Sequence, residues 1–125
     1  MSKDYKDFSS ERKQISRLIF KVLTERMSVK DALAVFPACH DDPTSLAAWH
    51  AVVHFEADED IRRRDLLYKD EQDSYLEMIG FILKDGKELP QNIIDSYNDY
   101  YKESLLAKPK GVKGFWATIA RFLHI

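Results

Sequence analysis

The chain has 125 residues, of which 45% are hydrophobic and 32% charged, and its formal net charge at pH 7 is −2. A chain of this length buries roughly two thirds of the surface that it exposes when unfolded, which suits one domain with its own core. Four glycines and four prolines are too few for a β-sandwich with its many turns. We therefore expect one domain over residues 1–125 that is all-α, a compact bundle of five to six helices.

The charge is distributed unevenly along the chain. Residues 1–40 carry eight basic and five acidic side chains, residues 41–101 carry six and fifteen, and residues 102–125 carry five and one. A nucleic-acid-binding domain normally has a basic excess, so the acidic middle argues against nucleic acid as a partner. The segment from Ser28 to Phe36 resembles the first helix of a helix-turn-helix, but it lacks the turn glycine, and acidic residues follow it.

Other features of the sequence bear on the compartment. The first residues contain no apolar signal segment, and no stretch approaches the roughly 20 apolar residues that a membrane span requires. The single cysteine, Cys39, has no partner for an internal disulfide. We expect a cytoplasmic protein.

The first half of the chain predicts three helices. Residues 1–9 form a polar arm, and Ser10 is the expected N-cap of the first helix. Ser28 and Asp31 have the spacing of a capping box and precede a short helix that Pro37 ends. Asp42 and Pro43 start the third helix. The apolar stripe of the first helix consists of Ile15, Leu18, Ile19, Val22 and Leu23.

The second half predicts further helices. We expect a break near residues 69–73, because acidic residues there resemble a helix opening and the apolar stripe changes phase. Gly86 is the expected C-terminal stop and Pro90 the start of the next helix. The expected inner faces consist of Tyr75, Leu76, Ile79, Ile82 and Leu83 before the stop, and of Ile93, Ile94, Tyr97, Tyr101 and Leu105 after it.

Two histidines are the strongest candidates for chemistry. His50 and His54 are spaced i, i+4, which places two imidazoles on one side of a helix where they can clamp a metal. Leu46, Val53 and Ile61 share the expected face of His50, so that ring should point inward. No Glu-x-x-His motif of the di-iron bundles accompanies the pair. We favour buried structural histidines and no cofactor; a small metal-dependent enzyme or metal sensor is the alternative.

Cys39, His40 and Asp41 are adjacent in the sequence. Catalytic cysteine and histidine normally converge from distant parts of a fold, so we interpret these neighbours as a loop that leads to a helix cap. We expect no catalytic residue here.

Acidic residues at positions 58–60 each precede an arginine by four residues, and the three arginines are Arg62, Arg63 and Arg64. Acid before base at this spacing stabilises an exposed helix by about 0.2–0.5 kcal/mol per pair. A solvated face explains this run. The alternative is a charged docking patch for a phosphate group or an acidic partner.

The end of the chain is amphipathic. A lysine- and glycine-containing linker over residues 108–114 precedes an expected helix over residues 115–125. Its apolar stripe must be covered by the protein's own core, by another chain or by lipid. We favour the bundle or a second subunit over a membrane surface, because the polar face carries little charge. The stripe consists of Phe115, Trp116, Ile119, Phe122 and Leu123.

These patterns do not specify an activity. The functional hypothesis is a non-enzymatic protein-interaction or regulatory module that binds a protein partner or a second copy of itself. The alternatives are the metal-dependent protein built on the two histidines and a peripheral membrane protein anchored by the terminal helix.

Overall fold

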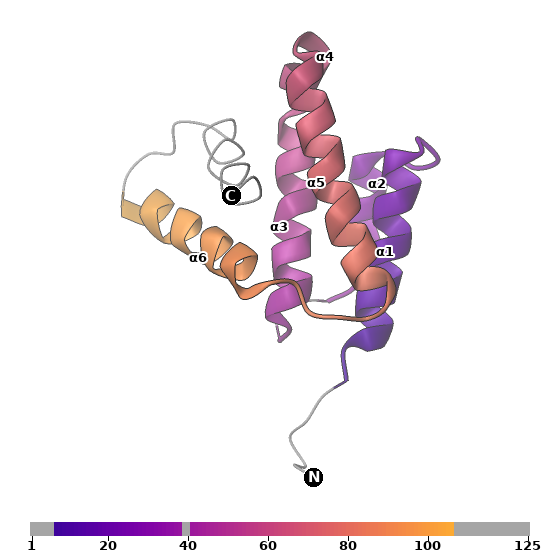
Figure 1. Cartoon of the computed structure of the whole chain (residues 1–125), viewed down its shortest axis with the longest axis vertical. Helices are drawn as coiled ribbons and strands as arrows, with labels where there is room; N and C mark the ends of the chain where they lie inside the picture. The colour runs from indigo at the N-terminus through magenta and orange to yellow at the C-terminus, as the bar shows by residue number, and fades with distance from the viewer. Residues whose placement is uncertain (1–6, 39–40, 107–125) are drawn as a thin grey trace.

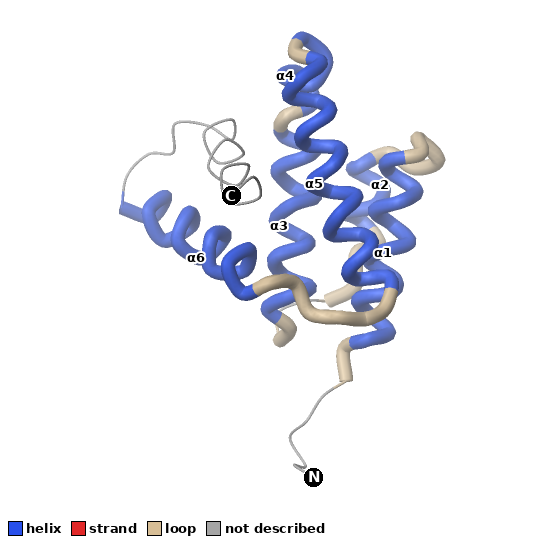
Figure 2. Tube along the Cα trace, viewed as in Figure 1, coloured by secondary structure: helices blue, strands red, loops and turns tan. Residues whose placement is uncertain are grey.

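The structure is a computed structural model in which residues 7–38 and 41–106 are described, the side chains of 100–106 excepted. Within these ranges the chain is helical and contains no strand, as expected for an all-α bundle (Figures 1 and 2). None of the helices in this part is both long and apolar enough to cross a membrane. The helices are α1 (Ser9–Leu23), α2 (Val29–Ala34), α3 (Pro43–Ala57), α4 (Glu59–Arg64), α5 (Leu66–Lys84) and α6 (Gln91–Leu106).

Local capping explains where several helices begin. The Asp42 carboxylate accepts hydrogen bonds from the backbone N–H groups of Thr44 and Ser45, both at 3.3 Å, at the start of α3. The Ser28 hydroxyl accepts from the backbone of Asp31 at 3.1 Å at the start of α2. Both predicted caps are therefore confirmed, whereas α1 begins at Ser9, one residue before the position that we expected for a cap.

The predicted break near residues 69–73 is wrong. Helix α5 continues through this segment, and the chain instead turns at Asp58 and at Asp65. The carboxylate of Asp65 caps α5 by accepting from the backbone N–H of Tyr68 at 3.1 Å. Because Gln72 is buried on the same face as Leu76, the inward stripe of α5 continues where a change of phase was expected.

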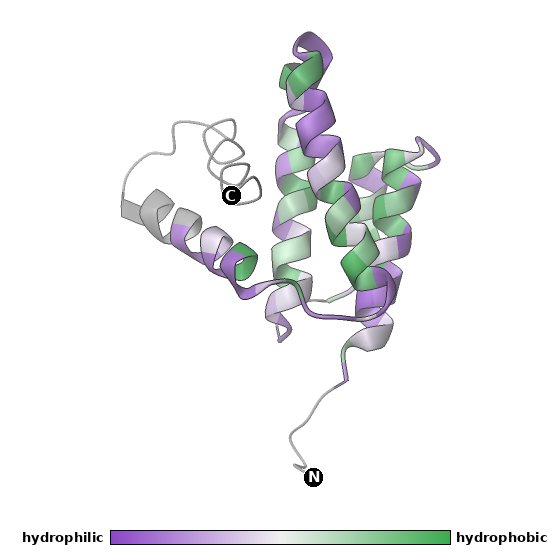
Figure 3. Cartoon of the chain, in the orientation of Figure 1, coloured by the Kyte–Doolittle hydropathy of each residue, from purple (hydrophilic) through white to green (hydrophobic). Residues whose placement is uncertain are grey.

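Helices α1 and α5 form the most extensive pair in the bundle. Gly80 lets them approach closely, since a Cβ at this position would lie 3.0 Å from the Phe20 ring and 3.2 Å from Cγ2 of Ile19. The Ser16 hydroxyl donates to the Gly80 carbonyl oxygen at 2.7 Å within this contact. Figure 3 shows hydrophobic residues concentrated in the second half of α5 and hydrophilic ones in much of its first half.

Helix α3 occupies the middle of the bundle, with α1, α2 and α5 on one side and α6 on the other (Figure 1). The face that we predicted as inner is only half-buried at Leu46 and Val53 of α3 and at Ile61 of α4. Apolar side chains occur on all sides of α3, so its sequence contains no narrow apolar stripe. Tertiary packing buries the side with small residues, which allows neighbouring helices to approach closely. The buried apolar residues of α3 are Ala47, Ala48, Ala51, Val52 and Phe55.

Candidate functional site

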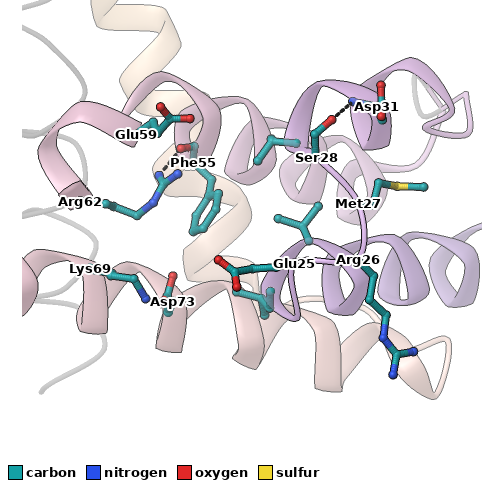
Figure 4. A pocket seen from close by; sticks show the side chains of 13 residues that line it. Glu25, Arg26, Met27, Ser28, Asp31, Phe55, Glu59, Arg62, Lys69 and Asp73 are labelled. Carbon is teal, nitrogen blue, oxygen red and sulfur yellow. Dashed lines mark hydrogen bonds and ion pairs between the residues drawn. The ribbon is translucent and has the colours of Figure 1, made fainter.

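A groove of about 710 Å³ lies at the end of the bundle formed by the α1–α2 turn, the end of α3, α4 and the first turns of α5 (Figure 4). Its apolar residues are buried or half-buried, whereas most of its charged residues are exposed. The lining residues are Val22, Leu23, Glu25, Arg26, Met27, Ser28, Val29, Asp31, Phe55, Glu59, Arg62, Lys69 and Asp73.

The α1–α2 turn forms one wall of the groove. The backbone N–H of Arg26 donates to the Lys21 carbonyl at 2.8 Å, and that of Glu25 donates to the Val22 carbonyl at 3.1 Å. This is the Schellman arrangement, in which the residue after the cap adopts a left-handed conformation that glycine favours. Here Glu25 has φ = 60° and takes that place. The turn therefore holds a charged side chain at the groove in a conformation that strains its backbone.

A buried polar network lies beside the groove at the α4–α5 corner. The Asp58 carboxylate accepts from the Tyr68 hydroxyl at 2.5 Å and from the Gln72 side-chain amide at 3.1 Å. Nη1 of Arg62 donates to the Gln72 side-chain oxygen at 2.8 Å and to the Phe55 carbonyl. Gln72 thus bridges Asp58 and Arg62, because its side-chain nitrogen donates to the carboxylate and its side-chain oxygen accepts from the guanidinium. We call these four side chains, Asp58, Arg62, Tyr68 and Gln72, the corner network.

Burial changes the electrostatics of the corner network. It raises the pKa of Asp58, and the hydrogen bonds from Tyr68 and Gln72 oppose that change only in part. Burial also raises the pKa of Tyr68, as does the hydrogen bond to Asp58, so its hydroxyl remains a neutral donor. The guanidinium carbon of Arg62 lies 3.6 Å from the centroid of the Phe55 ring. This cation–π contact stabilises a charge that is largely removed from water.

The three consecutive arginines do not form one exposed patch. Arg62 is only 9% exposed, so the predicted solvated face is wrong for this residue and for its acidic partner Asp58. Arg63 is exposed and contacts the carboxylates of Glu59 and Asp60 at 2.7 and 3.0 Å. Nε of Arg64 donates to the backbone carbonyl of Asp60 at 3.2 Å. Two neighbouring carboxylates therefore already form ion pairs with Arg63.

His50 and His54 lie on the side of α3 that packs against α6. The His50 ring stacks on Tyr97 with centroids 5.9 Å apart, and the centroid of the His54 ring lies 6.2 Å from that of Tyr97. His54 is 4% exposed and His50 is half-buried, so His54 is the deeper of the two. Burial, with a smaller contribution from His50, lowers the pKa of His54 to about 4, so its ring is neutral at pH 7.

The pair does not belong to a complete metal-binding set among the described residues, where no three His, Cys, Asp or Glu side chains cluster suitably. A zinc site requires three or four protein ligands. Cys39 and His40 lie outside the described residues, and so does the terminal stripe of Phe115, Trp116, Ile119, Phe122 and Leu123. The predictions made for those positions remain predictions.

The corner network was not predicted from the sequence. A signal for it was present, because Tyr68 and Gln72 are spaced so that they continue the stripe of Leu76, Ile79 and Leu83. A glutamine in that register predicts a buried amide that needs partners. Which partners it finds depends on how α3 and α4 fold back on α5.

Comparisons with protein-family models, with curated proteins and with solved structures find no match to this chain.

Proposed function

We propose that this protein is a non-enzymatic protein-interaction module whose groove binds a short segment of another protein. The observation that carries the proposal is the groove itself, which combines apolar residues with an exposed charged border over about 710 Å³. Apolar surface supplies most of the affinity in such sites, and the surrounding polar groups determine orientation and specificity.

Five helices, α1 to α5, and the turn between α1 and α2 contribute residues to the groove. Met27 and Val29 from the α1–α2 segment are half-buried and contribute apolar surface that a partner side chain can cover. The corner network supports this geometry, because it holds α4 against α5 through buried hydrogen bonds. A site on rigid elements loses little conformational entropy when it binds.

We place this module in the cytoplasm. The single cysteine supports a reducing compartment, where structural disulfides are rare.

Photo-cross-linking from inside the groove tests the proposal. Benzoylphenylalanine replaces Met27 in the full chain, which is expressed in its native cells and irradiated. The control carries the same residue at Glu88, which is exposed in the loop between α5 and α6 at the opposite end of the bundle. We expect the Met27 position, and not the Glu88 position, to give a discrete adduct with another protein, identified by mass spectrometry.

Other outcomes of this experiment are equally informative. An adduct between two copies of the chain would establish self-association through the groove. Equal labelling from both positions, or no adduct from Met27, would contradict the proposal.

A further inference from the structure

We propose that the partner segment carries a lysine or arginine beside its apolar residues, and that Glu25 is the groove residue that selects this cation. The inference rests on the proposed function and names the chemistry of the partner. It follows from an account of which charges in the groove are already engaged.

Most charged groups of the groove have a partner within the protein. Lys69 binds the Asp73 carboxylate at 2.7 Å, and Glu59 binds Arg63 at 2.7 Å. Arg62 is held in the corner network. Arg26 points away from the groove, as Figure 4 shows. These contacts leave the groove without an uncommitted cation that faces its interior.

Two exposed carboxylates of the groove, Glu25 and Asp31, form no ion pair within the described residues. Glu25 is the one that lies nearer the middle of the groove, toward which its side chain extends from the end of α1 (Figure 4). The Glu25 charge contributes slightly to the raised pKa of Lys69, but the Lys69 ammonium group is bound to Asp73. Glu25 is also exposed, so its carboxylate is accessible to a cation from outside.

The charges around the groove also favour a positively charged partner. Four carboxylates and three basic groups line the groove, and residues 43–84, which span α3–α5, contain nine acidic and five basic residues. An incoming anion would meet Arg62 only next to Asp58, Glu59 and Asp73, whose charges act on that guanidinium. A cation is attracted by the same carboxylates, and complementary charge of this kind raises specificity and association rate.

The conformation of Glu25 agrees with a role in binding. Its left-handed backbone, φ = 60°, is one that glycine would adopt without steric cost. Strained residues concentrate at ligand sites, where the side chain has a use other than stability. The turn itself needs only the backbone of residue 25, whereas recognition of a cation needs its carboxylate.

A random peptide library displayed on phage provides a defined probe. The library is selected on the immobilised full-length protein, and enriched peptides are synthesised and their binding is measured by fluorescence polarisation. We expect an excess of Lys and Arg among apolar residues in the enriched peptides. Glu25→Gln should weaken their binding roughly two- to fivefold at low salt, as expected for an accessible ion pair. Glu88→Gln, which removes an exposed charge at the opposite end, should leave binding unchanged.

Met27→Gln separates failure of the inference from failure of the proposed function. If Met27→Gln weakens binding but the peptides carry no basic excess, or Glu25→Gln has no effect, the groove binds peptides and the cation inference is wrong. If the library yields no binders, or its binders bind Met27→Gln and wild type equally, both proposals are wrong. Circular dichroism of each variant verifies that the fold is intact.

Discussion

The two halves of α5 are packed by different means. In the second half, Leu76, Ile79 and Leu83 are fully buried, and Gly80 brings the helix against α1. In the first half, the buried side chains Tyr68 and Gln72 belong to the corner network. Apolar contacts are non-directional, whereas a buried polar network stabilises only when each member has its partners. The apolar half therefore contributes most of the stability, and the polar half determines how α4 and the groove are positioned.

Removing the acid of the corner network is the strongest test of this comparison. Asp58→Leu deprives the Tyr68 hydroxyl and the Gln72 amide of their acceptor and leaves the buried Arg62 charge without its neighbour. We expect a loss of about 2–6 kcal/mol in the free energy of unfolding, because each of the two buried donors that lose their acceptor costs about 1–3 kcal/mol. Urea titration at pH 7 measures it.

Asp58→Asn is the matched control, because it keeps the shape and one acceptor oxygen, and it should cost less than Asp58→Leu. Burial raises the pKa of Asp58 in the folded state, so the native protein retains a proton that the unfolded chain has lost. Wild type should therefore lose stability relative to Asp58→Asn as the pH rises from about 4 through that raised pKa. The same pH dependence in wild type and Asp58→Asn would contradict the raised pKa of Asp58.

His54, one helical turn before Asp58, tests whether a second buried polar side chain lowers stability. The pKa of His54 is lowered from 6.5 to about 4, so between these values the unfolded chain binds a proton that the native chain does not. Stability should therefore fall as the pH falls from 6.5 to 4, by roughly 3 kcal/mol from this group. Urea titrations at pH 7 and pH 4.5 should show a smaller loss for His54→Gln than for wild type. Parallel losses would contradict this.

The same histidines allow a test of the metal alternative. If they are structural, replacing His50 and His54 by glutamine should lower stability and leave the metal content of the purified protein unchanged. Stoichiometric zinc or iron in wild type that disappears in the double variant, measured by atomic emission, would overturn the structural interpretation.

At the apolar end, Gly80→Val tests close packing of α1 against α5. The added atoms meet the Phe20 ring and Ile19 at contact distances of 3.0–3.2 Å before any relaxation. We expect a loss of about 1–3 kcal/mol, the usual cost of overpacking, measured by thermal and urea unfolding. Gly80→Ala adds only one carbon and gains about 1 kcal/mol of helix propensity, so it should lie closer to wild type. A valine variant as stable as wild type would mean that the interface relaxes easily.

The smallest expected effect is a gain. Glu25→Gly relieves the left-handed backbone of the α1–α2 turn and should stabilise the fold by about 0.5–1 kcal/mol, measured by urea titration. Glu25→Ala keeps the strain while removing the carboxylate, so it should not gain in this way. A gain of equal size in both variants would point to charge repulsion instead of backbone strain.

Much of the fold could be predicted because its signals are local. The N-cap at Asp42 and the stop at Gly86 use groups within a few residues of the helix ends. The stripe of Ile15, Leu18, Ile19 and Val22 follows directly from the helical period and is buried as expected. The groove offered no such signal, because its lining residues come from segments that are far apart in the sequence.

By itself, the sequence determined the all-α class, the starts of α2, α3 and α6, the end of α5, and most of the inner faces of α1 and α5. Hydrogen bonding near helix ends and a 3.6-residue period act over short separations. Only the tertiary structure decided which side of α3 is buried, where the chain turns between α3 and α5, and that Arg62 points inward while Arg63 remains in solvent. The inward position of Arg62 depends on its partners Gln72 and Phe55, which the chain brings to it by folding back on itself. A charged side chain is buried only where such partners compensate for lost water, and spacing along one helix carries no information about them.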